Sequence, residues 1–156
     1  MVYGGEAIPT TVDLQQASAE VGIVFRGANR IGSAGDINGD GFNDYVVSDV
    51  GYDLEEVYDV GFAFIGYGTE SLPSVIDVAE INMPGIKVMG HRSAEWFGNH
   101  VRPAGDFNGD GFNDVLIWGF RDRARNITEV IILFGGRDLP HELSTEDLGE
   151  HGVILT

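Results

Sequence analysis

Two short segments of the chain carry the residues best suited to chemistry. GDINGDGFND, from Gly35 to Asp44, recurs as GDFNGDGFND, from Gly105 to Asp114. Each copy contains the pattern D-x-N-x-D-G-x-x-D, which places side-chain oxygens at alternate positions of a tight turn, where they converge on one point. Three carboxylates and an amide oxygen form a hard, all-oxygen ligand set that suits calcium rather than zinc or copper. The pattern therefore predicts two Ca²⁺ sites per chain.

The predicted ligands are the side chains at positions one, three, five and nine of each turn and the backbone carbonyl at position seven. They are Asp36, Asn38, Asp40, Phe42 and Asp44 in the segment 36–44, and Asp106, Asn108, Asp110, Phe112 and Asp114 in the segment 106–114. A glycine at position six, Gly41 or Gly111, permits the positive φ of a sharp turn. The carboxylates of one turn repel one another, and a bound divalent cation would remove that repulsion. We expect these ions to be structural.

The residues after each turn separate this site from an EF-hand. An EF-hand requires a bidentate glutamate at position twelve and a helix on each side of the loop. Position twelve is Val47 in the first segment and Ile117 in the second, and both lie in apolar runs typical of strands. We therefore expect each loop to join the two strands of a β-hairpin. The alternative interpretation is a hydrogen-bonded Asx turn with solvated aspartates.

The composition restricts the class of function. Of 156 residues, 25 are Asp or Glu and 9 are Lys or Arg, so the formal net charge is −16. Such a charge repels phosphate backbones, and no nucleic-acid partner is expected. There is no cysteine, which excludes disulfides, thiolate metal sites and cysteine nucleophiles. No apolar run reaches the roughly 20 residues of a membrane span, and no serine stands in a nucleophile elbow; we expect neither membrane insertion nor enzymatic activity.

The chain also repeats itself outside these loops. A glycine-rich landmark occurs three times, as YGGEAIP (3–9), GYGTESLP (66–73) and FGGRDLP (134–140). A second landmark follows each of them, as GIVFRG (22–27), GIKVMG (85–90) and GVIL (152–155). The chain thus holds two periods of about 65 residues and an overlap, which indicates a repeat array rather than two independent domains.

Each period contains about four short apolar runs, rich in β-branched and aromatic residues, that favour strands over helices. They include DYVVSDV (44–50), VGFAFIGYG (60–68), DVLIWGF (114–120) and VIILFGG (130–136). Because these runs are continuously apolar, neighbouring sheets should cover both faces of each sheet. Four-stranded antiparallel sheets repeated in this way are blades of a β-propeller. We predict an all-β chain of about two blades plus an overlapping terminal strand, with the stretches 8–20 and 72–84 as connections between blades.

The unit of a strand, the loop GD-x-NGDG-x-x-D, a second strand and a strand ending in Phe-Gly-Gly resembles the FG-GAP repeat of integrin α-chain β-propellers and their bacterial relatives. The resemblance covers nearly the whole chain, 1–156, as one FG-GAP repeat region, and the calcium loops are its most specific part. Phe97-Gly98 matches the Phe-Gly element in the second repeat, whereas Gly27-Ala28 stands there in the first. The resemblance implies a module for protein or glycan recognition or adhesion, extracellular or at the cell surface, where millimolar calcium would fill even weak sites.

Two blades alone would leave apolar faces uncovered. We therefore expect either self-association of several copies into a closed ring, which we favour, or a place within a longer propeller. Trp96, Phe97 and Trp118 are candidates either for stacking on a sugar or for packing in the core of a blade. A carbohydrate-processing enzyme or lectin, and a pure assembly scaffold, are the alternative functions.

Overall fold

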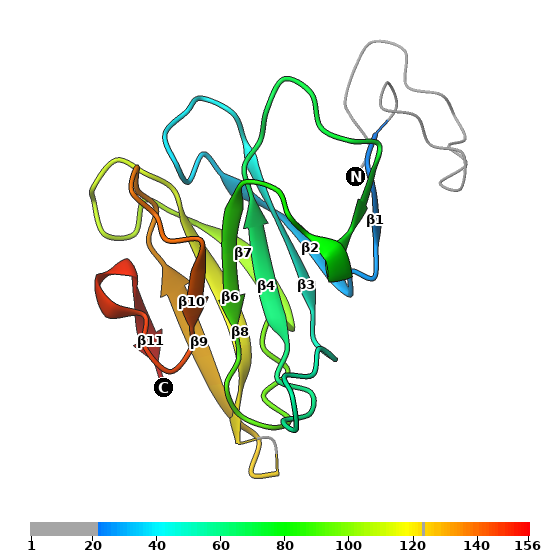
Figure 1. Cartoon of the computed structure of the whole chain (residues 1–156). Coiled ribbons are helices and arrows are strands. Elements are labelled where there is room, and N and C mark those ends of the chain that lie inside the picture. Colours follow the sequence, from blue (N-terminus) through cyan, green and yellow to red (C-terminus); the bar gives the residue numbers. More distant parts are fainter. Residues whose placement is uncertain (1–21, 123) are drawn as a thin grey trace, which may run out of the picture.

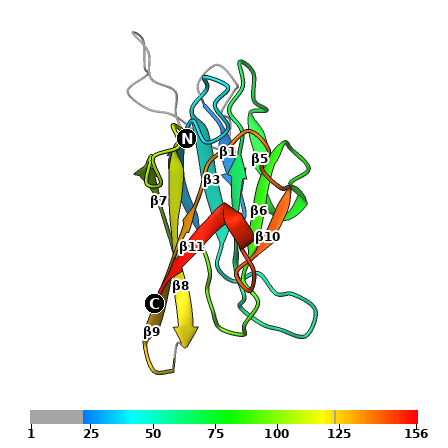
Figure 2. The same cartoon turned by 90° about the vertical axis from the view of Figure 1, so that its left-hand side faces the viewer.

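The computed structural model describes residues 22–122 and 124–156, and this part of the chain contains strands and two short 3-10 turns but no α-helix. The first sheet, called sheet I, contains β2 (Arg30–Gly35), β3 (Asp44–Asp49), β4 (Phe62–Gly66), β6 (Gly85–Met89) and β10 (Glu142–Ser144). Sheet II contains β7 (His100–Gly105), β8 (Asp114–Asp122), β9 (Ile127–Leu133) and β11 (Gly152–Leu155). The two sheets form two layers, packed face to face (Figure 1, Figure 2).

The two sheets repeat one another strand by strand. The order is β10-β6-β4-β3-β2 in sheet I and β11-β9-β8-β7 in sheet II, so that β2, β3, β4 and β6 are equivalent to β7, β8, β9 and β11. Neighbours within each set of four are antiparallel. Even an irregularity recurs, because the ladder shifts between Ser33 and Gly35 and again between Pro103 and Gly105. Both shifts lie immediately before one of the two segments 36–44 and 106–114, called the aspartate loops from here on.

In each repeat, a short strand also pairs in parallel with a strand of the preceding repeat. β5 (Val75–Asp77) pairs parallel with β1 (Val24–Arg26), and β10 pairs parallel with β6. The turns η1 (Val78–Glu80) and η2 (Gly149–His151) follow these short strands. Sheet I therefore has a fifth, parallel strand, and the prediction of four-stranded antiparallel sheets holds for sheet II only. Three residues are too few to show a strand pattern in the sequence. These strands form because a strand of a different repeat pairs with them.

The main core lies between the two sheets. It contains alternate residues of the facing strands, among them Val46 and Ile65 of sheet I and Ile117 and Ile131 of sheet II, all of them buried. Fully burying one such side chain stabilises a protein by roughly 1.5–3 kcal/mol. This shared layer of side chains holds the two repeats together.

The outer faces of the two sheets differ. Residues of β1, β5 and η1 cover the outer face of sheet I and form a second apolar cluster with Val47 and Phe64. Every residue of β4 is buried, whereas buried and half-buried residues alternate along most of β8. The prediction that neighbouring sheets cover both faces is confirmed for sheet I. For sheet II it stays a prediction, because the described residues give sheet II a neighbouring sheet on one face only.

The described strands form an all-β chain but do not close a ring, and the number of blades stays a prediction. The first landmark, 3–9, and the connection predicted at 8–20 lie outside the described residues. The second connection, 72–84, contains β5 and η1. Within the described ranges, no helix is long and apolar enough to cross a membrane.

Tyr45, in the outer cluster of sheet I, leads to a prediction for alkaline conditions. Its side chain is buried beside Phe25, with ring centroids 5.1 Å apart, and its hydroxyl donates to Met83 Sδ (3.8 Å). Burial and, secondarily, the charge of Asp44 raise the pKa of Tyr45 to about 12, from the ordinary 10.0. The stability provided by the neutral hydroxyl is complete below the unfolded pKa and is lost as the pH rises toward the folded one. We expect the free energy of unfolding to fall by about 2–3 kcal/mol across this window.

Denaturant unfolding at a series of pH values measures this fall. Tyr45→Phe should reduce it strongly, and Tyr67, whose pKa is also raised by burial, accounts for a further part. Tyr58→Phe is the control, because Tyr58 is 62% exposed. If Tyr45→Phe and Tyr58→Phe left the same alkaline fall, the assignment to Tyr45 would be wrong.

Candidate metal loops

Both aspartate loops lie in β-hairpins, as the sequence predicts. The first joins β2 to β3 and the second joins β7 to β8. The loops project from the same side of the molecule, in cyan and yellow-green (Figure 1). Because strands flank each loop, the hairpin setting is confirmed and the paired helices of an EF-hand are absent from these described segments.

The first aspartate of each loop holds the turn together through backbone amides. Asp36 Oδ1 accepts hydrogen bonds from the N–H groups of Gly39 (2.8 Å) and Asp40 (3.0 Å), and Asp36 Oδ2 accepts from Gly41 N–H (2.9 Å). Asp106 makes the same three contacts in the second loop, at 2.8, 2.9 and 3.0 Å. The two loops therefore share one conformation, set by their shared sequence.

The middle aspartate of each loop lies at the exposed tip. Asn38 Nδ2 donates to Asp40 Oδ2 (2.9 Å), and Phe42 N–H donates to Asp40 Oδ1 (2.9 Å). The second loop repeats both contacts with Asn108, Asp110 and Phe112. The structure thus brings positions one, three and five of each predicted ligand set together. Phe42 and Phe112 take part through their N–H groups, and the role of their carbonyls stays a prediction.

The last aspartate of each loop points inward. Asp44 is 2% exposed; its Oδ2 accepts from Ile37 N–H (2.8 Å) and its Oδ1 from Gly68 N–H (2.7 Å). Asp114, 0% exposed, makes the equivalent contacts with Phe107 N–H (2.6 Å) and Gly135 N–H (2.8 Å). Gly68 follows β4 and Gly135 follows β9, which are equivalent strands of the two sheets. Each inward aspartate therefore ties its loop to the chain that leaves β4 or β9.

The electrostatics of the first loop are unfavourable for three carboxylates. Burial raises the pKa of Asp44, the hydrogen bonds from Gly68 and Ile37 lower it, and the charges of Asp40 and Asp36 raise it again; the net direction is upward. The three acidic groups are thus close enough to repel one another. A cation bound among them would offset this repulsion.

Two glycines belong to the site although the sequence marks them only as parts of a landmark. A Cβ atom on Gly68 would collide with the backbone oxygen of Asn43, and one on Gly135 would collide with the backbone oxygen of Asn113. Only glycine allows its backbone to approach the loop so closely. The recurrence of this glycine after β4 and β9 is the signal that points to the role.

The two loops also contact each other across the repeat boundary. The backbone N–H and the Nδ2 of Asn113 both donate to Asp36 O, at 3.2 and 3.3 Å. Gly136 N–H donates to Ile37 O (2.8 Å). The ring of Phe112 lies against Gly39. The loops are therefore part of the joint between the sheets, and not two isolated surface turns.

The donors fit calcium in their chemistry but only partly in their arrangement. All candidate ligands are oxygens, as calcium requires. Across residues 22–122 and 124–156, however, no three acidic or histidine side chains converge closely enough to hold a metal ion. Backbone amides engage the oxygens of Asp44 and Asp114, and Asn38 engages Asp40. Calcium binding therefore stays a prediction.

Other buried acids have structural partners. Glu95 Oε2 accepts from the N–H groups of His91 and Arg92, both at 2.9 Å, and Glu129 Oε1 lies 3.4 Å from Arg92 Nη1. In the described ranges, every buried side-chain nitrogen or oxygen has a hydrogen-bond partner. These acids therefore stabilise the turn at 91–95 and its contact with β9.

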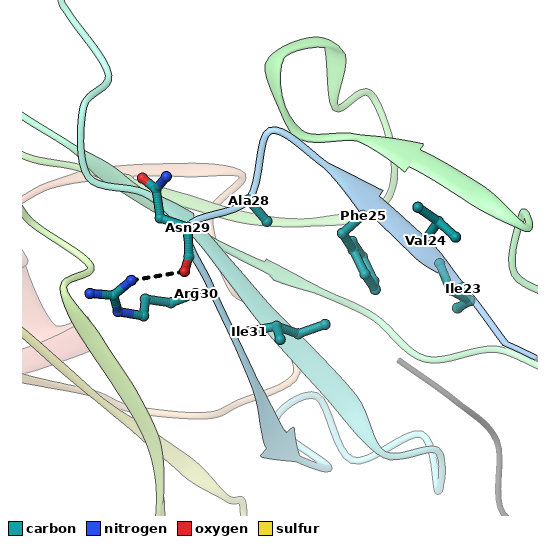
Figure 3. A pocket seen from close by; sticks show the side chains of 7 residues that line it. All are labelled: Ile23, Val24, Phe25, Ala28, Asn29, Arg30 and Ile31. Carbon is teal, nitrogen blue, oxygen red and sulfur yellow. Dashed lines mark hydrogen bonds between the residues drawn. The ribbon is translucent and has the colours of Figure 1, made fainter. Parts of the chain in front are cut away.

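A hollow of about 200 Å³ lies between β1 and β2 (Figure 3). Ile23, Phe25 and Ile31 line it with apolar side chains, and Arg30 turns its guanidinium away to donate to Asn29 O (2.9 Å). The lining residues include no acid, histidine or hydroxyl group. The hollow offers packing space rather than chemistry.

No protein-family model and no curated protein matches this chain in sequence.

Proposed function

We propose that the chain is a calcium-stabilised β-propeller module of the FG-GAP type that serves protein or glycan recognition or adhesion, extracellularly or at the cell surface. The observation that supports it is the repeated unit: two sheets of the same strand order, each with the same aspartate loop after its first strand. Two exposed aromatic rings within the loops, Phe42 and Phe107, suit contact with a partner. The proposal assigns no catalytic residue.

The loop oxygens would hold the ions. The ligands in this proposal are Asp36, Asn38, Asp40, the Phe42 carbonyl and Asp44, and their equivalents Asp106, Asn108, Asp110, the Phe112 carbonyl and Asp114. A bound calcium ion supplies two positive charges against the crowded carboxylates. Because Asp36 O also accepts from Asn113, a more stable first loop means a more stable contact between the sheets.

Thermal unfolding in calcium and in chelator tests this proposal. Calcium should raise the unfolding temperature, because an ion that binds only the folded chain stabilises it by about 2.7 kcal/mol per loop when free calcium is about 100 times Kd. Asp40→Ala and Asp110→Ala should each remove about half of the rise, and the double variant nearly all of it.

Glu56→Ala is the matched control. It removes the same charge from an exposed position in the connection between β3 and β4, at the end of β3 away from the loop. The calcium-dependent rise should persist in this variant. An equal rise in the natural chain and the double variant would contradict the proposed loop sites.

A further inference from the structure

We infer that the outer edge of β11 captures residues 8–13 of a second copy of this chain as a short parallel strand. The inference rests on the proposed repeat array, but it does not depend on calcium binding by the loops.

Two contacts within the structure show how such a capture works. β5 adds to the edge of β1, and β10 adds to the edge of β6, both in parallel. Val24 N–H donates to Ser74 O (2.9 Å) in the first contact, and Lys87 N–H donates to His141 O (2.8 Å) in the second. Val24 and Lys87 are each the third residue of their landmark, GIVFRG and GIKVMG. The same bond thus forms at the same place in both repeats.

β11 is the third equivalent strand, and its outer edge has no such partner among the described strands. Leu155 of β11 is 46% exposed, whereas its equivalent in β6, Val88, is 0% exposed and lies opposite Leu143 of β10. Ile154 is also exposed. An edge strand with open backbone groups and exposed apolar side chains is a template for a further strand.

The chain contains a third copy of the segment that the other two edges bind. LPSVID (72–77) includes β5, LPHELS (139–144) includes β10, and IPTTVD (8–13) has the same pattern of aliphatic residue, proline, two residues and aliphatic residue. In the two described copies the second aliphatic residue is covered: Ile76 is 4% exposed, and Leu143 packs against the core between the sheets. Threonine and valine at 10–12 favour an extended strand.

The register of the described pairs transfers directly. Ile76 lies opposite Phe25, and Leu143 lies opposite Val88. Phe25 and Val88 are each the fourth residue of the landmark, and so is Leu155. Val12 of the second copy should therefore lie opposite Leu155, with Ile154 N–H donating to Thr10 O.

The edge, rather than the outer face of sheet II, is the part to which the repeat geometry transfers. Gly32 and Ser48 line the contact between sheets I and II, where a Cβ on Gly32 would already lie 3.4 Å from Val101 O. Their equivalents on the outer face of sheet II are Arg102 and Trp118. Because these side chains are larger, the close approach of the two sheets at Gly32 does not transfer to this face.

The contact joins two different surfaces, so it is head-to-tail and builds chains or rings of copies. It is small, and association is therefore weak and increases with protein concentration.

Because the chain has no cysteine, an engineered pair tests the register directly. Val12→Cys with Leu155→Cys, oxidised at high protein concentration, should yield disulfide-linked dimers and larger species that a reductant returns to monomer. Residues opposite each other on neighbouring strands meet the distance that a disulfide needs. Replacing the exposed Leu155 should leave the fold intact.

Thr11→Cys with Leu155→Cys is the matched control, because residue 11 faces the other side of the proposed strand. It should form at least tenfold less linked product. Linking should be unchanged when Asp40→Ala and Asp110→Ala are added, which separates this inference from the calcium proposal. Sedimentation of the natural chain should show a mass that rises with concentration, and Val12→Asp should abolish the rise.

Four results would overturn the inference. They are equal linking in the two cysteine pairs, a disulfide closed within one copy, linking through Ile76→Cys in place of Val12→Cys, and a monomeric mass at every concentration. A glycan competitor provides a further test. If it prevented disulfide linking but left the sedimentation mass of the natural chain unchanged, the edge would bind sugar and the inference would be wrong.

Discussion

Replacing Asp44 by alanine should lower the free energy of unfolding by about 3 kcal/mol even in the presence of chelator, because two buried amides lose their acceptor. These are the N–H groups of Ile37 and Gly68, which lie 2.8 and 2.7 Å from the Asp44 oxygens. Without the Asp44 carboxylate, the first loop is no longer hydrogen-bonded to the chain that leaves β4. Denaturant unfolding in EDTA measures it.

Asp40→Ala is the control for this experiment. Asp40 is exposed at the tip of the same loop, so water can replace its contacts, and the expected loss in chelator is below about 1 kcal/mol. In calcium the difference in stability between the two variants should be smaller, because each variant lacks one proposed ligand. If the two variants were equally stable in EDTA, the structural role given to the inward aspartate would be wrong.

Gly98→Ala should cost about 4 kcal/mol, because backbone strain and a collision act together. Gly98 has a φ of 87°, and a Cβ atom there would lie 2.6 Å from Ser48 Cβ and 2.9 Å from Phe62 O. Ser48 Oγ also donates to Gly98 O (2.7 Å), so the two chains cannot separate without losing this bond. The Phe-Gly element therefore lies where the segment before β7 closely approaches sheet I.

Gly111→Ala isolates the strain from the collision. Gly111 has a similar φ of 94°, but no atom lies within 4 Å of the place where its Cβ would stand. The expected cost is about 1 kcal/mol, which is typical of alanine in this backbone region. Equal losses in Gly98→Ala and Gly111→Ala would show that packing around Gly98 is looser than the structure indicates.

The strands that the sequence predicts well are those with their own apolar signal. The run 114–120 became β8 and the run 130–136 overlaps β9, since buried β-branched residues fix both. β2 has no such signal: RIGSAG contains one large apolar residue, Ile31, and it is a strand because β3 pairs with it. β5 and β10 likewise depend on edges supplied by another repeat.

The candidate site shows the same division. The spacing of Asp36, Asn38 and Asp40 is local, and the sequence alone places these residues in one turn. The inward position of Asp44 depends on Gly68, which lies 24 residues away along the chain. The contact of Asn113 with Asp36 depends on how two repeats stack. Such long-range contacts follow from packing and cannot be read from the spacing of one loop.

The number of calcium ions bound per chain tests the proposed loop sites without any intermediate step. Equilibrium dialysis against millimolar calcium, followed by elemental analysis of the protein, should give two ions for the natural chain. Either Asp40→Ala or Asp110→Ala should leave one, and the double variant none. If the natural chain bound no calcium under these conditions, or the double variant bound as much as the natural chain, the two loops would not be calcium sites.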